Sequence, residues 1–174
     1  PSGCGKTTAV NLLLRYYEPD AGEITVDGAP LRQSGDPYAR TTVVRQEAVL
    51  FRDTLRNNLS MYRPVPEDRL LDALRSVGLD RFASPDALDR MVEEGGANFS
   101  GGEKKRLCLA RALLRDTDVL ILDEPLANLD RETVDRIEDL LLAIRDRTVL
   151  VVSHQFSPGK LGAFDEVKEL AAGA

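Results

Sequence analysis

A run of four apolar residues, Val119-Leu120-Ile121-Leu122, constrains the fold of this chain more than any other feature. Continuous apolar strands of this kind occur in parallel sheets, because helices cover both faces of such a sheet. The run ends in two carboxylates and a proline, Asp123-Glu124-Pro125. In open α/β sheets, ligands bind outside the carboxyl ends of the strands, so these carboxylates are candidates for a site.

The segments around this run alternate between strand and helix patterns. Strands are predicted at residues 24–26 and 41–45, with a second buried strand at 148–152. Helices are predicted at residues 6–17, 54–59, 66–77, 100–114 and 130–145, with a weaker helical stretch at 84–94. The first helix is expected to carry Tyr17 on its apolar side, and Asp27-Gly28 is expected to form a turn. This alternation predicts an α/β fold with a largely parallel sheet.

Composition narrows the class of protein. The 174 residues, 43% of them apolar and 30% charged, describe a globular chain with one core. The net charge of −6, without a basic stripe, argues against nucleic acid as the main partner. Cys4 and Cys108 lie far apart and lack metal-ligand spacing, which favours a reduced, cytosolic compartment. The sequence has no apolar run long enough to span a bilayer, and it begins inside a motif, so we expect a fragment of a longer chain.

That motif is the closing part of a phosphate-binding loop, G-x-x-x-x-G-K-[ST], which ends here in Gly5-Lys6-Thr7. In such loops backbone N–H groups cradle phosphates, the lysine reaches the β and γ phosphates, and the hydroxyl binds Mg²⁺. The dipole of the helix that follows adds positive potential to the same site. The residues expected to bind the nucleotide are Ser2, Gly3, Cys4, Gly5, Lys6, Thr7 and Thr8.

Four polar side chains directly follow predicted strands: Gln46, Asp123, Glu124 and His154. Since the carboxyl ends of parallel strands meet at one edge, we expect these side chains to surround the phosphates. Asp123 can hold Mg²⁺ opposite Thr7, and Glu124 can orient or deprotonate an attacking water. His154 can hydrogen-bond the γ phosphate, and Gln46 can contact both the metal and the water. This inventory predicts hydrolysis of a phosphoanhydride.

A second anion site is predicted where Ser100-Gly101-Gly102-Glu103 begins a helix. The phosphate loop already supplies one helix N-terminus to the nucleotide. If the second start cannot reach that nucleotide, it would bind the nucleotide of another subunit, which predicts a head-to-tail dimer. The basic residues that follow, Lys104-Lys105-Arg106, are interpreted as a solvated helix face rather than a nucleic-acid patch.

Together these motifs resemble the ATP-binding domain of an ABC transporter. The family's elements occur in order as the phosphate loop at 2–8, the Q-loop at Gln46, the signature at 99–103, Walker B at 119–124, the D-loop at 126–130 and the switch histidine at His154. Residues 16–28, 49–59 and 94–98 are similar to exporter-type members in particular. The chain departs from the family at Phe99 and Glu103, where Leu and Gln are usual.

The resemblance implies a P-loop NTPase fold, an ABC-type ATPase domain with a RecA-like core over residues 1–174. A helical subdomain would be inserted at approximately 47–114. ATP, with Mg²⁺, would lie between the phosphate loop of one domain and the signature of a second ABC ATPase domain. Ser100, Gly101 and Gly102 would contact that ATP, and Asp130 would cross the interface. The expected function is ATP hydrolysis that powers export, with transmembrane domains as partners at the cytoplasmic face of the membrane.

Two other function classes stay open at this stage. One is a soluble ABC-type ATPase of the translation or DNA-repair kind. The acidic balance and the lack of a coiled-coil insertion between Gln46 and Ser100 argue against it. The other is a nucleotide-sensing partner that does not hydrolyse ATP, and the presence of both Glu124 and His154 argues against that class.

Overall fold

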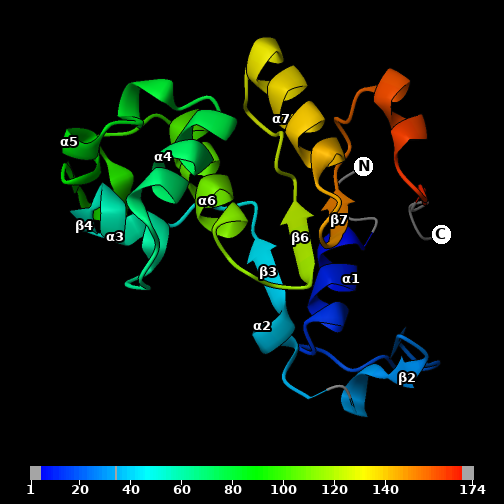
Figure 1. The fold of residues 1–174 in the computed structure, drawn as a ribbon. Helices are drawn as coiled ribbons and strands as arrows, with labels where there is room; N and C mark the ends of the chain where they lie inside the picture. Colours follow the sequence, from blue (N-terminus) through cyan, green and yellow to red (C-terminus); the bar gives the residue numbers. More distant parts are fainter. Residues whose placement is uncertain (1–4, 34, 170–174) are drawn as a thin grey trace.

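The computed structural model describes residues 5–33 and 35–169 (Figure 1). The expectations for Ser2, Gly3 and Cys4 fall outside these residues. A three-stranded parallel sheet of order β3-β6-β7 forms the centre of the fold, with β3 at Thr41–Val44, β6 at Val119–Asp123 and β7 at Thr148–Val152. The predicted α/β fold with a parallel sheet is confirmed.

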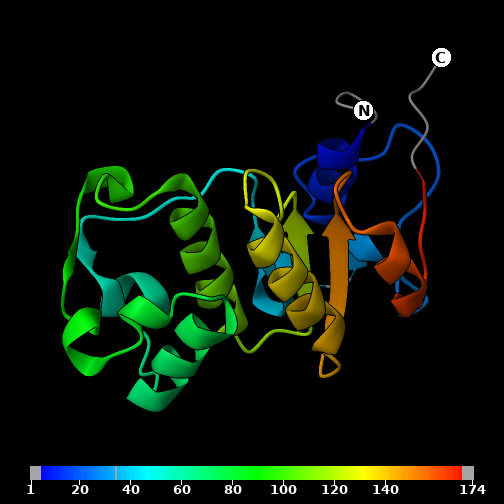
Figure 2. The ribbon, with the colours of Figure 1, turned by 90° about the horizontal axis from the view of Figure 1, so that it is seen from above.

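Helices cover both faces of this sheet, as Figure 2 shows with the strands between α1 (Lys6–Leu13) and α7 (Arg131–Ala143). Ile121 of β6 packs against Val10 and Leu14 on the α1 side. The neighbouring β6 residues Leu120 and Leu122 face the larger cluster that α7 shares with α6 (Gly101–Leu113). Successive strand residues point to opposite faces, so a continuous apolar strand is what this central position requires.

Strand β7 differs from the prediction of a second buried strand. None of its residues is fully buried, and Leu150 is 37% exposed. The reason is its place at the edge of the sheet, where it pairs only with β6 among the described strands. An apolar run in the sequence cannot distinguish a central strand from an edge strand.

The first helix is shorter than predicted. It ends at Leu13, and Arg15 adopts a left-handed backbone with φ of 58°. The N–H groups of Arg15 and Tyr16 bond back to the carbonyls of Leu12 and Asn11, which closes the helix as a Schellman motif. Tyr17, expected on the apolar side, therefore lies beyond the helix and is 58% exposed.

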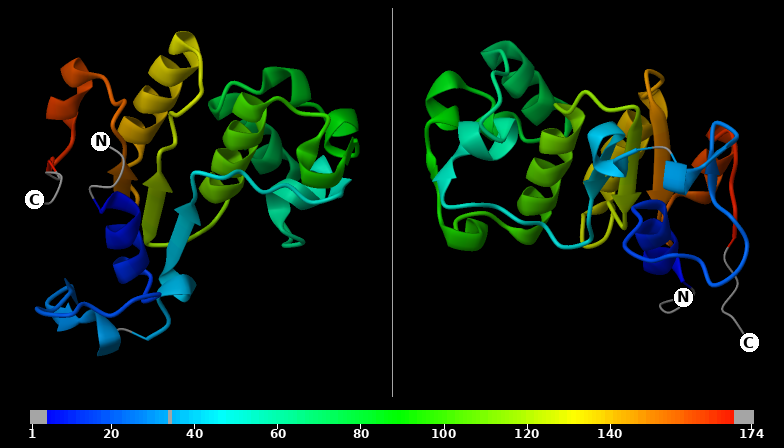
Figure 3. Two further views of the ribbon diagram at one scale, coloured as in Figure 1. Left: turned by 180° about the vertical axis from the view of Figure 1, so that it is seen from behind. Right: turned by 90° about the horizontal axis from the view of Figure 1, so that it is seen from below.

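A group of helices packs beside β3 at one end of the sheet (Figures 1 and 3). It contains α3 (Leu55–Ser60), α4 (Glu67–Ser76), α5 (Pro85–Leu88) and α6. Leu55, Leu59, Leu74, Leu88 and Leu107 are fully buried in its core. The predicted helical stretch at 84–94 is wrong beyond α5, because β5 (Met91–Val92) pairs antiparallel with β4 (Asp53–Thr54). The boundary of a helical subdomain at 47–114 stays a prediction.

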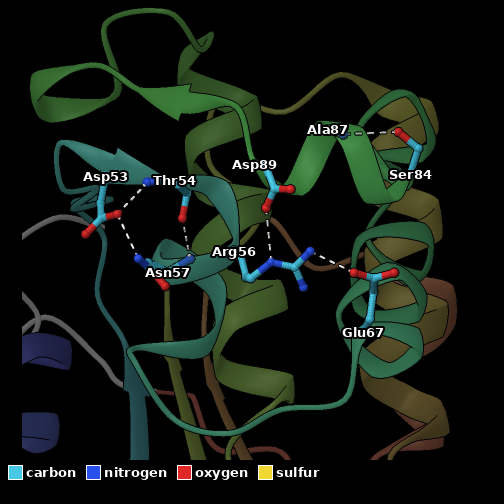
Figure 4. A network of polar contacts seen from close by, with 8 residues as sticks. All are labelled: Asp53, Thr54, Arg56, Asn57, Glu67, Ser84, Ala87 and Asp89. Carbon is cyan, nitrogen blue, oxygen red and sulfur yellow. Dashed lines mark hydrogen bonds and ion pairs between the residues drawn. The ribbon is translucent and has the colours of Figure 1, made fainter.

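Polar contacts join the helices of this group (Figure 4). The Arg56 guanidinium of α3 pairs with Glu67 at the start of α4 at 2.7 Å and with Asp89 after α5 at 3.2 Å. Thr54 caps α3 by accepting the N–H of Asn57 at 3.1 Å. One arginine thus ties three short helices that would be marginal alone.

Short elements complete the described chain: β1 (Thr25–Val26), β2 (Ala29–Pro30), η1 (Leu31–Gln33), α2 (Pro37–Arg40), η2 (Asp80–Phe82), η3 (Glu94–Gly96) and η4 (Pro158–Ala163). The predicted turn at Asp27-Gly28 joins β1 to β2, with φ of 52° and 78°. Two positive φ values are the mark of a type I′ hairpin turn. In the part of the chain that the structure describes, no helix is both long and apolar enough to cross a membrane.

Candidate active site

The carboxyl ends of β6 and β7 and the start of α1 meet at one edge of the sheet (Figure 1). Here the Glu124 Oε1 lies 2.8 Å from His154 Nδ1 and 3.4 Å from Lys6 Nζ. These three residues come from distant parts of the chain, and the structure brings them together at the edge where the sequence pattern placed them.

Glu124 occupies an unusual backbone conformation. Its φ of 52° lies in the left-handed region, which non-glycine residues rarely adopt. Its N–H donates to the carbonyl of Val152 on β7 at 2.8 Å, and its side chain is buried, with the residue 6% exposed. Backbone strain of this kind costs about 1–3 kcal/mol and concentrates at functional sites. The strain thus singles out Glu124 among the carboxylates of this edge.

The surroundings of Glu124 keep it ionised. Burial raises the pKa of its carboxyl, but the hydrogen bond from His154 and the nearby charges of His154 and Lys6 together hold the pKa below its ordinary value. Its second oxygen, Oε2, is buried and has no hydrogen-bond partner among the described residues. An unpaired buried acceptor costs about 1–3 kcal/mol. A water that donates a hydrogen bond to Oε2 would remove this cost. A general base must hold its water in this way in order to take a proton from it.

Asp123 and Thr7 form an oxygen-rich corner next to Glu124. Thr7 lies beside the buried Asp123 carboxylate, and its hydroxyl favours the charged form of that carboxylate. Burial and the Glu124 charge raise the pKa of Asp123, and Arg45, Lys6 and the Thr7 hydroxyl only partly oppose them. A cation would relieve this unfavourable charge.

The donors at this corner fit Mg²⁺, which prefers oxygen ligands and usually keeps several waters and phosphate oxygens in its shell. Thr7 supplies a hydroxyl and Asp123 a carboxylate. Residues 5–33 and 35–169 contain no group of three or more His, Cys, Asp or Glu that could hold a metal by itself.

The start of α1 offers a cradle for an anion. The helix follows Gly5, whose φ of 85° requires glycine, and no described side chain caps its first turn. The first N–H groups of an uncapped helix need a partner, and a phosphate is well suited because the helix dipole also favours it. Thr8 lies exposed in this first turn.

The remaining predicted site residues form no hydrogen bond or ion pair with Glu124 within the part of the chain that the structure describes. Gln46 lies two residues beyond the end of β3 with an exposed side chain, and it makes no polar side-chain contact with another described residue. Ser100 and Gly101 are exposed at the start of α6. Asp130 caps α7, where its oxygens accept from the Thr133 N–H at 3.0 Å and from the Thr133 hydroxyl at 2.7 Å. The roles of these residues toward ATP stay predictions.

Sequence reasoning misjudged the basic residues of α6. Lys105 and Arg106 were expected on a solvated face, but both are half-buried. The Lys105 ammonium donates to the carbonyls of Ala127 at 2.8 Å and Glu124 at 3.3 Å. Arg106 donates to the carbonyl of Gly78 at 2.7 Å. Nothing local in the sequence signals these contacts, because the acceptors are backbone carbonyls far along the chain.

Glu103 was also missed, although a readable signal was present. Its carboxylate accepts the Ser100 N–H at 2.9 Å while the Ser100 hydroxyl accepts the Glu103 N–H at 3.3 Å, which forms a capping box. The S-x-x-E spacing predicts this pair from sequence alone. Glu103 also pairs with Arg81, so its acidic side chain is compensated at the start of α6.

A hydrogen bond and ion pairs join the segment that follows His154 to α7. Glu138 of α7 is fully buried, and its Oε1 accepts the Ser157 N–H at 2.6 Å. Lys160 lies 3.4 Å from the same carboxylate and 2.7 Å from Asp139. These contacts hold the chain three residues beyond His154, while β7 holds it on the other side.

A parallel sheet that collects an uncapped helix start, a lysine and buried carboxylates at its carboxyl edge is the arrangement of P-loop nucleotide-binding folds. Residues 1–127 match the sequence model described as ABC transporter. The chain belongs to the ABC transporter family.

Curated relatives share more than a third of their aligned residues with this chain. P-glycoprotein 14 of Caenorhabditis elegans is 38% identical over 162 residues, 90% of this chain and 12% of the relative. The ATP-dependent lipid A-core flippase of Burkholderia pseudomallei (strain 1710b) is 39% identical over 162 residues, 90% of this chain and 27% of the flippase. The glutathione/L-cysteine transport system ATP-binding/permease protein CydC of Escherichia coli (strain K12) is 40% identical over 158 residues, which are 88% of this chain and 28% of CydC.

A solved structure agrees with these relatives. The fold is similar to that of a bacterial Atm1-family ABC exporter with ATP bound, with a TM-score of 0.79 and 32% identity. The alignment covers 89% of this chain and 28% of the exporter chain. The chain therefore spans between about an eighth and a little over a quarter of the length of the relatives it matches.

Proposed function

We propose that this chain is the ATP-hydrolysing domain of an ABC exporter. The observation that carries the proposal is the Glu124 carboxylate, held by Lys6 and His154 beside the uncapped start of α1 with one oxygen unpaired. The names of the relatives, a flippase and a transport system among them, support transport rather than a soluble ABC ATPase.

The chemistry follows from the positions of the side chains. Lys6 neutralises charge on the β and γ phosphates, and the N–H groups of the first turn of α1 cradle them. Glu124 Oε2 accepts a hydrogen bond from the attacking water and takes its proton as the water attacks the γ phosphorus, while the bond from that phosphorus to the bridging oxygen breaks and ADP leaves. Mg²⁺, when bound with ATP, would be held by Thr7 and Asp123, with Gln46 as a further ligand, and supplies neutralisation of phosphate charge.

His154 has a double task in this proposal. An ionised carboxylate only accepts hydrogen bonds, so His154 Nδ1 donates to Glu124 Oε1 and fixes the orientation of that carboxylate. The other ring nitrogen, Nε2, is then the atom available to the γ phosphate. It donates to a phosphate oxygen only when the imidazole is protonated. His154 thus connects the base, Glu124, to the phosphate that the water attacks.

The partners are proposed from exposed surfaces. Ser100 and Gly101 lie open at the start of α6 and suit the ATP of a second ABC ATPase domain in a head-to-tail dimer. Asp130 would lie at that interface. Large apolar side chains are exposed on the helical side of the molecule, namely Val49, Phe51, Tyr62 and Met91. Transmembrane domains at the cytoplasmic face of the membrane are the proposed partners of this surface.

The test is the Glu124→Gln substitution in the full-length protein. We expect ATP binding to persist and hydrolysis to fall by roughly a hundredfold or more, because the amide no longer accepts a proton. Glu18→Gln, at an exposed carboxylate outside the site, should hydrolyse ATP like the wild type. Undiminished hydrolysis by the Glu124→Gln protein would contradict the assignment.

A further inference from the structure

The turn that follows β6 holds the backbone of Glu124. The Ala127 N–H donates to the Glu124 carbonyl at 3.3 Å, which closes the turn. Leu126 is fully buried inside it, in the cluster that α6 and α7 share. The carbonyls of Glu124 and Ala127 both remain able to accept another hydrogen bond, because each carbonyl oxygen has two lone pairs.

Lys105 of α6 donates to both of these carbonyls, at 3.3 Å for Glu124 and 2.8 Å for Ala127. Its ammonium is half-buried, and burial lowers the pKa of this lysine more than the Glu124 charge raises it. Removing an ammonium from water is costly unless acceptors replace the water. By contrast, the adjacent Lys104 has no polar side-chain partner among the described residues, so the contact is specific to one position of the helix.

A second contact joins α6 to the segment after β6. A Cβ added to Gly102 would lie 3.3 Å from Leu129 Cδ2 and 3.9 Å from the Asn128 carbonyl oxygen. The start of α6 therefore lies directly against residues 128 and 129. Together with the Lys105 hydrogen bonds, this contact links the exposed start of α6 to the backbone of Glu124.

We propose that Lys105 is a positioning residue for Glu124. Its two hydrogen bonds fix the carbonyls of Glu124 and Ala127 at the two ends of this turn, and so hold Glu124 in its left-handed conformation, with Oε2 available to the attacking water. Without Lys105, the strained backbone can relax and the carboxylate moves away from that direction. The inference rests on the proposed function, and it adds that the helix carrying the second anion site sets the geometry of the base.

The experiment compares Lys105→Met with the matched control Lys104→Met in the full-length protein. For Lys105→Met we expect kcat for ATP hydrolysis to fall about tenfold or more, with KM changed less than about twofold. Only the orientation of the Glu124 carboxylate is disturbed, and ATP binding is not. Lys104→Met should hydrolyse ATP like the wild type. Lys105→Arg, which keeps a charged donor of similar reach, should recover much of the lost kcat.

A double-mutant cycle separates positioning of Glu124 from a general effect on the fold. Adding Lys105→Met to Glu124→Gln should cause no further loss of hydrolysis, because the base that Lys105 positions is already absent. The proposal is overturned if the Lys105→Met protein hydrolyses ATP with the same kcat as the Lys104→Met protein. It is also overturned if hydrolysis by Lys105→Met falls only in proportion to the fraction of folded protein, measured by circular dichroism. The same holds if the losses of hydrolysis caused by Lys105→Met and by Glu124→Gln add in the double variant. Undiminished hydrolysis by Glu124→Gln, or none in the wild type, would instead overturn the proposed function itself.

Discussion

Two helix starts in this molecule are expected to meet phosphate, and they are built in opposite ways. The start of α1 follows Gly5 and is not capped by any described side chain. The start of α6 is closed by a complete capping box between Ser100 and Glu103. The start of α1 leaves its first N–H groups available to bind a ligand. The start of α6 pairs some of its first N–H groups with its own side chains and presents the glycine backbone beside them. The site at α1 therefore depends on its ligand more than the site at α6 does.

The glutamates beside these two starts show the same contrast. Glu124 is 6% exposed and Glu103 is 8% exposed, so both are buried. Glu124 has a left-handed backbone and an unpaired oxygen. Glu103 uses both oxygens, one for the Ser100 N–H and one for Arg81. Incomplete pairing and strain mark the carboxylate proposed for chemistry, while complete pairing marks the carboxylate that stabilises a helix.

The largest expected effect comes from removing the cation at the open start. Lys6→Met should weaken ATP binding by roughly a hundredfold, because a lysine that contacts phosphate supplies charge-assisted hydrogen bonds. Titration of the full-length protein with a fluorescent ATP analogue measures this loss. Lys168→Met, at an exposed lysine paired with Glu166, is the control and should bind like the wild type. Equal affinities would show that α1 is not the phosphate site.

The next effect compares the two glutamates directly. Glu103→Ala should lower the free energy of unfolding by about 1.5 kcal/mol, because the capping box and an ion pair are lost. Glu124→Ala should lower it by less than about 0.5 kcal/mol, because the unpaired buried oxygen disappears together with the favourable contacts, while the left-handed backbone is equally strained in alanine. Urea unfolding of both variants gives the two values. A larger loss for Glu124→Ala would reverse the comparison.

A smaller effect tests the cap itself. Ser100→Ala should cost about 1 kcal/mol of stability, the usual value for an N-cap serine. Ser84 caps the four-residue helix α5 through the Ala87 N–H at 3.3 Å, so Ser84→Ala is a matched variant on a helix with less to lose. We expect a smaller loss there in the same unfolding assay. Equal losses would mean that the capping box at α6 adds nothing beyond a single hydrogen bond.

The smallest expected effect is the loss of the stability that Glu103 contributes as the pH falls. Burial raises the pKa of Glu103, but the hydrogen bonds from Ser100 and the charges of Arg81 and Arg106 bring it below its ordinary value. A carboxyl with a lowered folded pKa stabilises the protein above its unfolded pKa, and this contribution is lost as the pH falls through the folded value. The difference in unfolding free energy between wild type and Glu103→Gln should therefore shrink below about pH 4. A difference that is constant from pH 7 to pH 3 would contradict this reading.

Local and periodic features were the ones that the sequence could predict. The apolar run of β6, the Ser100 and Asp130 caps and the Asp27-Gly28 turn are encoded in neighbouring residues. The principle that strand ends share an edge also placed Glu124 and His154 near Lys6.

Features that depend on distant contacts could not be predicted in the same way. The pairing of β4 with β5, the edge position of β7 and the two carbonyls held by Lys105 each require knowledge of which segments become neighbours. The left-handed backbone of Glu124 is another such feature, because a glutamate carries no preference for it. The sequence thus located the site, and the tertiary structure showed what strains and supports it.

The central claim is that the open start of α1 in one subunit and the capped start of α6 in another complete one ATP site. Mixing two full-length variants tests it directly. Lys6→Met alone and Ser100→Glu alone should each be inactive, the second because its carboxylate repels phosphate. In a mixed dimer, one site would keep both Lys6 and Ser100. We predict that mixing and reassembly restores ATP hydrolysis to roughly a quarter of the wild-type rate, since about half of the dimers are mixed and half of their sites are intact. Activity that stays at the level of the separate variants would contradict a site shared between subunits.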